Sequence, residues 1–412
     1  MSLADLAAAP GARDDDAPII SPLVFKALMA ALAGLFVAKA LHFFGIGQIH
    51  AAKKLLDFDA FHVAGQLVWR GEMAKAYSYL SMEALERTLG GGDGFLPWTY
   101  PPPFNLVVAP FGLMPLGPAY MMFVGLTLAA FLVVMRRIAG PHLPVVLMTI
   151  FPALAVNISC GQNGFLTGAL IGAGALMLGE GRALAGLPLG AMIIKPHMAV
   201  PFALLALGRR FWGVIAVGVV TVALACLAAT LAFGAGIWAA FLAGVEEAKV
   251  FLAVGQYPLY RMISVYALVH SLGAPALAAM VAQVVVAGLA LAFVAEMLRQ
   301  GAPLRRAAGF AALVSPLISP YAYDYDLTIM GVGLALLWGD LSARMTRTEE
   351  VRLMILSALA TGTGMLLNLK HEIVFGQAKV DPSDLPPSLA FLLLAPLVIL
   401  VWRTLQRAPL RA

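Results

Sequence analysis

The sequence predicts an all-α protein that crosses a membrane many times. Three observations support this fold class: 61% of the 412 residues are hydrophobic, only 12% are charged, and long apolar runs recur from end to end. Average globular domains carry about 25% charged residues. This chain has too little polar surface for a fold surrounded by water, and its apolar runs approach the length at which a helix spans a bilayer.

About twelve apolar runs are expected to form one multi-span domain over 23–402. The first follows the acidic stretch ARDDDAP instead of a basic one, so 23–46 is predicted to be a retained helix and not a cleaved signal. The expected segments are 23–46, 116–135, 141–157, 165–180, 184–194, 198–208, 211–233, 274–298, 307–320, 327–341, 352–369 and 387–402.

Two of these runs and one further piece are too short to cross. The runs 184–194 and 198–208 are predicted to form a hairpin with Lys195-Pro196-His197 at its tip. The apolar piece 103–114 is expected to enter the membrane without crossing it. A lysine at membrane depth normally implies an anionic partner or a wet cavity, although Lys195 could also extend to the outer headgroups.

The connections predict the orientation of the chain. Short connections are rich in arginine, whereas the longer ones are aromatic and acidic. Positive residues in short loops stay in the cytoplasm. We therefore expect cytoplasmic tails at 1–22 and 403–412, and polar loops, including the outer loop 48–103, on the periplasmic side of a plasma (inner) membrane. The arginine-bearing connections include Arg136-Arg137, Arg182, Arg209-Arg210, Arg305-Arg306 and Arg344.

Several classes of site are not expected. The net charge of +5 is scattered between apolar runs, which does not favour nucleic acid binding. No phosphate-binding glycine loop appears, so substrates are expected to arrive from the lipid or the periplasm. Cys160 and Cys226 lie in apolar context and are predicted to be buried, and no metal-ligand spacing occurs. We therefore expect no metal and no other cofactor.

The first outer loop holds the densest group of ionisable residues, in DFDAFHVAGQLVWRG at 57–71. Asp57 at its start has two interpretations: a helix N-cap, or a general base whose pKa is lifted by partial burial. The sequence also predicts an amphipathic helix that lies on the membrane surface. Its apolar stripe consists of Phe58, Phe61, Ala64, Leu67 and Val68.

The same loop ends in FLPWTYPPPFNL. Trp98 and Tyr100 are typical of interfacial anchors, and they could also form a platform on which a sugar stacks. The second polar connection, NISCGQNG, places Asn157, Gln162 and Asn163 at a helix junction. Amides there either cap the next helix or donate hydrogen bonds to hydroxyl-rich ligands.

Two later connections add further candidates. In VGQYPLYRMISVY, the planar fork of Arg261 suits a phosphate, and the alternative is an interface anchor. In SPYAYDYDL, two acids among three tyrosines could bind a sugar, a cation or a proton. Asp326 precedes an apolar run directly and is equally well interpreted as an N-cap.

In their order, these motifs resemble glycosyltransferase family 87, which belongs to the GT-C superfamily of multi-span enzymes. The resembling pieces are DFDAFHVAGQLVWRGEMAKAYSY, FLPWTYPPPFNLVVAPFGLMPL, SCGQNG, IKPH, LGRRFW and SPYAYDYDL, and they run from about Asp57 to Leu341. Two positions depart from the pattern of the relatives: His62 stands where a tyrosine is common, and Tyr325-Asp326 where some branches carry paired histidines.

The resemblance implies an inverting transfer of a mannose-like hexose from a polyprenyl-monophosphate donor to an envelope lipid or glycan acceptor. It maps the catalytic base onto Asp57, with Asp59 as the competing assignment. Membrane lipids are expected as further partners of the protein. A secondary transporter or flippase of envelope precursors is the alternative function. The expected substrate-binding residues are Asp59, His62, Tyr100, Gln162, Asn163, Lys195, His197, Tyr257, Arg261, Tyr323, Asp324 and Asp326, with Lys195 and Arg261 holding the phosphate.

Overall fold

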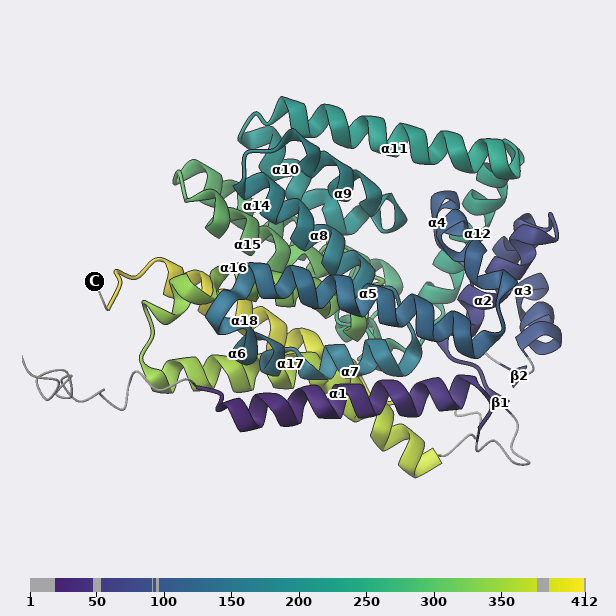
Figure 1. Cartoon of the computed structure of the whole chain (residues 1–412), viewed down its shortest axis with the longest axis horizontal. Helices are drawn as coiled ribbons and strands as arrows, with labels where there is room; N and C mark the ends of the chain where they lie inside the picture. The colour runs from purple at the N-terminus through teal and green to yellow at the C-terminus, as the bar shows by residue number, and fades with distance from the viewer. Residues whose placement is uncertain (1–18, 47–52, 91, 94–95, 376–384, 411–412) are drawn as a thin grey trace, which may run out of the picture.

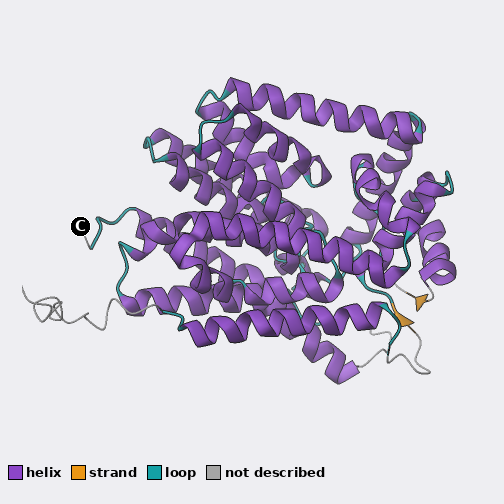
Figure 2. Cartoon of the chain, in the orientation of Figure 1, coloured by secondary structure: helices purple, strands orange, loops and turns teal. Residues whose placement is uncertain are grey.

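A computed structural model describes residues 19–46, 53–90, 92–93, 96–375 and 385–410, and these residues are mostly helical (Figure 1; Figure 2). The only strands in this part of the chain are a parallel pair of two residues each, β1 (Lys53–Lys54) and β2 (Gly92–Asp93). The helices are α1 (Pro22–Phe43), α2 (Asp57–Trp69), α3 (Tyr79–Leu85), α4 (Pro102–Val108), α5 (Leu116–Ala139), α6 (Leu143–Thr149), α7 (Phe151–Cys160), α8 (Gly164–Gly179), α9 (Gly186–Ala191), α10 (Val200–Gly208), α11 (Trp212–Phe233), α12 (Gly236–Ala253), α13 (Val265–Ser271), α14 (Ala276–Arg299), α15 (Leu304–Val314), α16 (Leu327–Ser342), α17 (Arg347–Phe375) and α18 (Ala390–Leu405).

Five helical stretches are long and apolar enough to cross a membrane. On α11 and α14, large apolar side chains face outward, and Leu231 and Leu277 are each more than three-quarters exposed. Exposed apolar surface of this extent marks a contact with a membrane or another protein, and the length and hydropathy of these helices fit a lipid bilayer. The chain is therefore a membrane protein. The five stretches are Pro22–Phe43, Leu116–Thr149, Trp212–Phe233, Ala276–Arg299 and Arg347–His371.

The remaining apolar helices are shorter than a span, so twelve full crossings remain a prediction. The expected segment 141–157 is broken at Ile150 into α6 and α7, and α7 has only 10 residues. At 1.5 Å per residue, α7 is about 15 Å long, half the thickness of the hydrocarbon layer. The predicted hairpin is present as α9 and α10, with two short 3-10 turns and a break in the helix at Lys195 between them.

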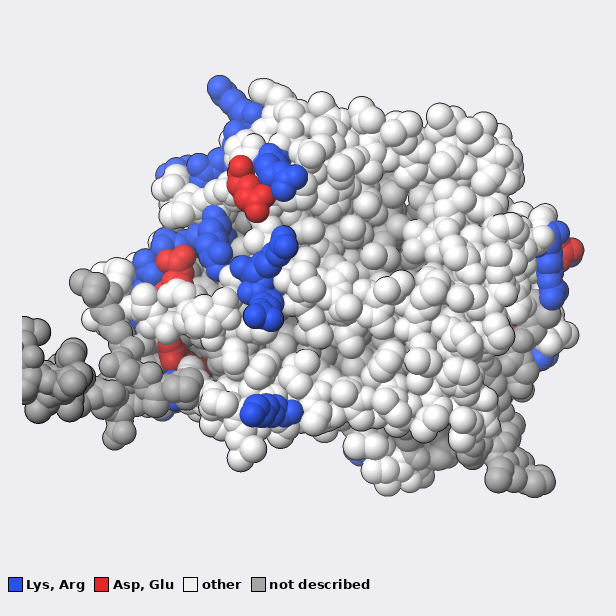
Figure 3. Space-filling view, viewed as in Figure 1, with Lys and Arg blue, Asp and Glu red and all other residues white. Residues whose placement is uncertain are grey.

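Most of the charged side chains in this view gather at the end of the molecule near the C-terminus, and a smaller group lies at the opposite end (Figure 3). A broad uncharged surface covers the middle of the same view. The charged end holds the ion pairs of Arg306 and Arg344 with Asp340, and of Arg407 with Glu349. This separation matches the positive-inside pattern, in which such an end faces the cytoplasm.

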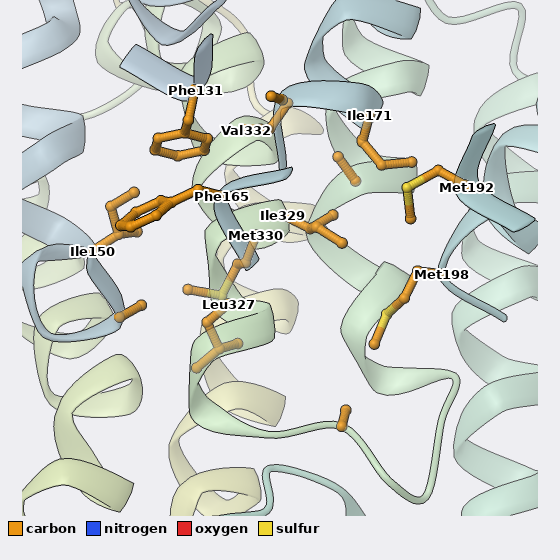
Figure 4. Close-up of a cluster of buried hydrophobic side chains, with 14 of the residues drawn as sticks. Phe131, Ile150, Phe165, Ile171, Met192, Met198, Leu327, Ile329, Met330 and Val332 are labelled. Carbon is orange, nitrogen blue, oxygen red and sulfur yellow. The ribbon is translucent and has the colours of Figure 1, made fainter. Parts of the chain in front are cut away.

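The core is built by small residues that let helices approach. On α8, Gly168 and Gly172 lie one turn apart against Phe131 and Val134 of α5. Because glycine carries no side chain, the two backbones pack closely, as is common between membrane helices. Phe131, Phe165 and residues of α16 such as Val332 fill the space between these helices (Figure 4).

Helix α2 departs from its predicted place on the membrane surface. Phe58, Phe61, Ala64 and Leu67 of its apolar stripe are fully buried, and the helix packs against α4 and the 3-10 turn Ala109–Leu113. Gly65 permits this close approach. The stripe therefore packs in the protein interior, and α2 is held as a rigid wall of the molecule.

Candidate functional site

A cavity of about 760 Å³ opens where several short elements end. Its wall is formed by the start of α2, the segment 96–101, the end of α7, the hairpin tip around Lys195, and the turn 323–326. Residues of α1, α12 and α17 complete it. Elements that stop within the fold thus bring polar loops from distant parts of the sequence to one place.

Asp57 is the first residue of α2 and lines this cavity. Its Oδ2 atom is buried and has no hydrogen-bond partner among the described residues. Burial raises the pKa of the Asp57 carboxyl above its ordinary value, and the positive charge of Arg261 opposes that rise. A carboxylate with a free oxygen and a raised pKa is suited to accept a proton.

The competing acid, Asp59, has a structural role. Its Oδ2 accepts a hydrogen bond from the backbone N–H of Leu56 at 2.8 Å, which closes the first turn of α2. Asp59 is 1% exposed and is not among the residues that line the cavity. The N-cap of α2 is Leu56, and Asp59, the third residue of the helix, supplies the carboxylate that bonds to its backbone N–H, so Asp57 does not cap the helix.

The turn Asp324–Asp326 holds two cations from distant parts of the chain. Asp326 Oδ1 accepts a hydrogen bond from Lys195 Nζ at 2.6 Å, and both side chains are buried. Asp324 accepts two hydrogen bonds from Arg261, at 3.0 and 3.3 Å. Both predicted phosphate ligands therefore already have a carboxylate partner.

Asp326 occupies the N-cap position of α16, as one of its two interpretations predicted, but its side chain makes no capping hydrogen bond to that helix. Its Oδ2 accepts instead from the backbone N–H of Tyr323 at 3.1 Å, inside its own turn. The predicted anionic partner of Lys195 is thus Asp326, held in place by its own backbone.

Hydrogen bonds from two sides fix the turn. Asn157 Nδ2 donates to the backbone oxygen of Tyr325 at 2.8 Å, and Asn157 Oδ1 accepts from the N–H of Gly164 at 3.0 Å. On the other side, Tyr323 pairs with Met262 in an antiparallel bridge, which brings Arg261 to Asp324. Of the amides predicted to cap the next helix, Asn157 is the one that bonds to its first N–H.

Aromatic rings form much of the remaining wall. Tyr323 and Tyr325 stack in parallel with centroids 5.3 Å apart. Lys195 Nζ lies 4.8 Å from the centroid of Tyr325, a cation–π distance. Tyr100 lines the cavity and donates its hydroxyl hydrogen to Gln162 Oε1 at 3.0 Å. Trp98, expected as an interfacial anchor, is 2% exposed and donates to Asn105, so that interpretation is wrong for Trp98.

Most predicted site residues meet in the cavity. Besides Asp59, two of them are not among the lining residues: His62 bonds to the backbone oxygen of Met114 at 2.8 Å, and Asn163 is fully buried. The predicted residues that line the cavity are Asp57, Tyr100, Gln162, Lys195, His197, Tyr257, Arg261, Tyr323, Asp324 and Asp326.

Sequence reasoning missed other lining residues. Lys39 of α1 and Asn368 of α17 face the cavity from helices expected to be ordinary spans. For Lys39 a signal was present, because a lysine inside an otherwise apolar helix usually has a function. Cys160, predicted to be a buried thiol, is buried and also lines the cavity. Within the described residues, no group of three or more His, Cys, Asp or Glu could hold a metal ion.

Comparison with known families identifies one match. The family model described as Glycosyltransferase family 87 matches residues 98–320, just over half of the chain. The matched range includes Tyr100, Gln162, Lys195 and Arg261, and leaves out Asp57 and the turn at 323–326. No curated protein and no solved structure matches the chain significantly.

Proposed function

Because this chain belongs to glycosyltransferase family 87 and is a membrane glycosyltransferase, we propose that it transfers a mannose-like hexose from a polyprenyl-monophosphate donor. The proposed acceptor is an envelope lipid or glycan on the periplasmic side. The observation that carries the proposal is Asp57, whose carboxylate lies in the cavity with one oxygen unpartnered among the described residues. Family membership favours this reading over a transporter or flippase.

The transfer would proceed in one displacement. Asp57 removes the proton of an acceptor hydroxyl, whose oxygen attacks the anomeric carbon from the face opposite the phosphate. A new C–O bond forms as the bond between the anomeric carbon and the phosphate oxygen breaks. The polyprenyl phosphate leaves with that electron pair, and the configuration at the anomeric carbon inverts.

The cations of the cavity would hold the donor phosphate. Lys195 and Arg261 each have a carboxylate partner, but both keep further N–H groups that can donate to phosphate oxygens. The two acids would fix these cations in position before the donor arrives. Preorganised donors of this kind stabilise charge that develops as a bond breaks.

The base assignment is tested with two matched variants, Asp57→Asn and Asp59→Asn. Asp57→Asn keeps the size of the side chain and removes the base, which should lower kcat by about 10²–10⁴-fold without loss of thermal stability. Asp59→Asn should weaken the first turn of α2 by about 1 kcal/mol and retain most activity. The measurement is sugar transfer by the purified full-length protein in lipid nanodiscs.

The opposite pattern, an active Asp57→Asn protein beside an inactive Asp59→Asn protein, contradicts the assignment. The donor is identified with a panel of polyprenyl-phosphate sugars offered with envelope lipids as acceptors. Nuclear magnetic resonance of the product reads the anomeric configuration. Retention of the donor configuration would exclude the single displacement.

A further inference from the structure

Lys39 of α1 is a cation of the cavity wall that has no carboxylate partner among the described residues. Three other lysine and arginine side chains line the cavity, and each of them is paired: Lys195 with Asp326, Arg261 with Asp324, and Lys249 with Glu246. Their positive charges are therefore balanced within the protein. Lys39 supplies a positive charge that remains available to a ligand.

The position of Lys39 on α1 turns it toward the protein. The buried residues Leu32 and Phe43 are seven positions before it and four after it, so all three share one face of the helix. Phe43 stacks on Tyr120 of α5, which fixes this face against the core. The exposed apolar residues Val37 and Leu41 lie on the opposite side. Lys39 thus does not extend from the lipid-facing side of α1.

An unbalanced cation near a hydrocarbon layer is costly unless an anion meets it. A sugar joined through phosphate to a lipid carries one negative charge on its phosphodiester. When the sugar leaves, a second negative charge develops on the phosphate. A protein site that binds this phosphate therefore needs net positive charge. The cations that are paired with carboxylates supply only part of that charge.

Lys39 of α1 and Leu369 of α17 both line the cavity. Helices α1 and α17 both pack against α7, and the short α7 ends at Cys160 within the cavity wall. Leu369 of α17 lines the cavity and is 52% exposed, so it marks a mouth on the apolar surface. An exposed apolar residue in the cavity wall offers a place where a hydrocarbon chain could pass from the cavity to lipid.

We propose that Lys39 binds the phosphate of the lipid-linked sugar donor, and that the hydrocarbon chain of the donor leaves the cavity beside Leu369, between α1 and α17. This inference rests on the proposed function. It adds a phosphate ligand outside the polar loops and assigns the side of the protein from which the donor arrives.

A charge series at position 39 tests the phosphate ligand. Lys39→Gln should raise the donor KM by about tenfold and weaken inhibition by free polyprenyl phosphate by more than that, because the product carries the greater charge. Lys39→Arg should stay within about threefold of the wild type, and Lys39→Glu should be worse than Lys39→Gln. Lys26→Gln, a change at an exposed lysine on the same helix, serves as the control and should have no effect.

Unchanged donor KM and unchanged product inhibition in Lys39→Gln would overturn the assignment, as would an order of effects that does not follow charge. Phosphatidylglycerol in the nanodisc should not compete with polyprenyl phosphate. Competition by that headgroup at equal concentration would mean a general anionic lipid site and would also overturn the proposal.

Two leucines of α17 test the path of the chain. Leu369→Trp should narrow the mouth and raise the KM for a long-chain donor several-fold, while a donor with a short two-isoprene chain is used as before. Leu366→Trp is the matched control, since Leu366 is equally exposed but does not line the cavity. Equal effects of the two variants, or no effect of Leu369→Trp, would contradict the path.

Failure of this inference can be distinguished from failure of the proposed function. If the wild-type protein transfers no sugar from any polyprenyl-phosphate donor, the proposed function fails, whatever Lys39 does. Binding of unglycosylated polyprenyl phosphate, measured by native mass spectrometry, then still tests the site. Loss of that binding in Lys39→Gln but not in Lys26→Gln supports the site, and equal binding by both variants overturns it.

Discussion

The balance of charge around Asp57 governs how this residue ionises. Burial disfavours its carboxylate form, whereas the guanidinium of Arg261 favours it. A general base must be ionised to accept a proton, so the pKa of Asp57 sets the acidic limb of the pH profile. In the proposed mechanism Arg261 would therefore act at the base as well as at the donor phosphate.

Replacing Arg261 should move this limb. In Arg261→Gln the opposing charge is lost, the pKa of Asp57 rises further, and kcat/KM falls at a higher pH than in the wild type. Arg261→Lys keeps the charge and should leave the limb close to its original position. Profiles of kcat/KM against pH measure both variants. A limb that moves equally in both, or in neither, would show that Arg261 does not set the ionisation of Asp57.

Glu86 is a further buried acid of the first outer loop. It is 1% exposed, and neither carboxylate oxygen has a hydrogen-bond partner among the described residues. Burial, with help from the negative charges of Asp59 and Glu83, raises the pKa of Glu86 to about 8. In the unfolded chain this group ionises near its ordinary value of 4.5.

Stability should therefore depend on pH. Between pH 4.5 and about 8 the folded protein binds more protons at Glu86 than the unfolded chain does, so stability is lost as pH rises through this window. Glu86→Gln cannot ionise and should gain thermal stability over the wild type at about pH 9, with little difference at about pH 5. Parallel thermal unfolding curves at all pH values would contradict this role.

The residues of the site could be predicted from their types, but their pairings could not. Asp57, Lys195, Arg261 and Asp326 stood out as polar groups between apolar runs. Lys195 and Asp326 are 131 positions apart, so nothing local in the sequence joins them. Asp57 is the first residue of the helix and Leu56 its N-cap, so a shift of one residue from the predicted start places Asp59 where it bonds to the N-cap backbone and leaves an oxygen of Asp57 without a partner among the described residues.

At the scale of elements, the position of α2 depends on one close contact between its backbone and that of the turn 109–113. Gly65 of α2 and Gly112 of the following turn meet so closely that a Cβ on Gly112 would lie 2.1 Å from the carbonyl carbon of Gly65. Trp69 donates a hydrogen bond to the backbone oxygen of Ala109, and His62 bonds to the backbone oxygen of Met114. This contact holds the helix that begins with Asp57.

Gly112→Ala should push α2 away. The opposing atoms are backbone and cannot yield, so we expect a loss of about 3 kcal/mol or more, above the usual cost of overpacking, together with reduced kcat. Gly125→Ala on α5 is the control, because the nearest atom to its Cβ is 3.6 Å away. Thermal unfolding and transfer rates measure both. Wild-type stability in Gly112→Ala would mean that the close contact does not position α2.

Element boundaries were predictable where a run was long and apolar, as for α11 and α14. The short elements were not, since periodicity alone does not reveal a break such as the one at Ile150. The apolar stripe of α2 correctly predicted an amphipathic helix. It did not predict what the stripe packs against, because an apolar face suits lipid and protein equally well. Tertiary packing decided between them.

For the whole molecule, the separation of charged and apolar surface predicts which end faces the cytoplasm. The end near the C-terminus, where most of the visible charged side chains gather (Figure 3), should be cytoplasmic, and the loops that line the cavity should be periplasmic. With Cys160 and Cys226 replaced by alanine, a cysteine introduced at the exposed Leu80 should react with an impermeant maleimide in cells whose outer membrane is permeabilised. A cysteine at the exposed Gln300 should react only after the inner membrane is opened. The reverse labelling pattern would invert the topology.

The turn from Tyr323 to Asp326 alternates rings with acids. The two acids hold the cations, and the two rings stack beside them at the cavity wall. Changes at the rings can therefore reshape the surface that a sugar touches while both charge pairs persist. In this arrangement the choice of sugar can drift over evolutionary time without a loss of the charge pairs that are proposed to hold the donor phosphate.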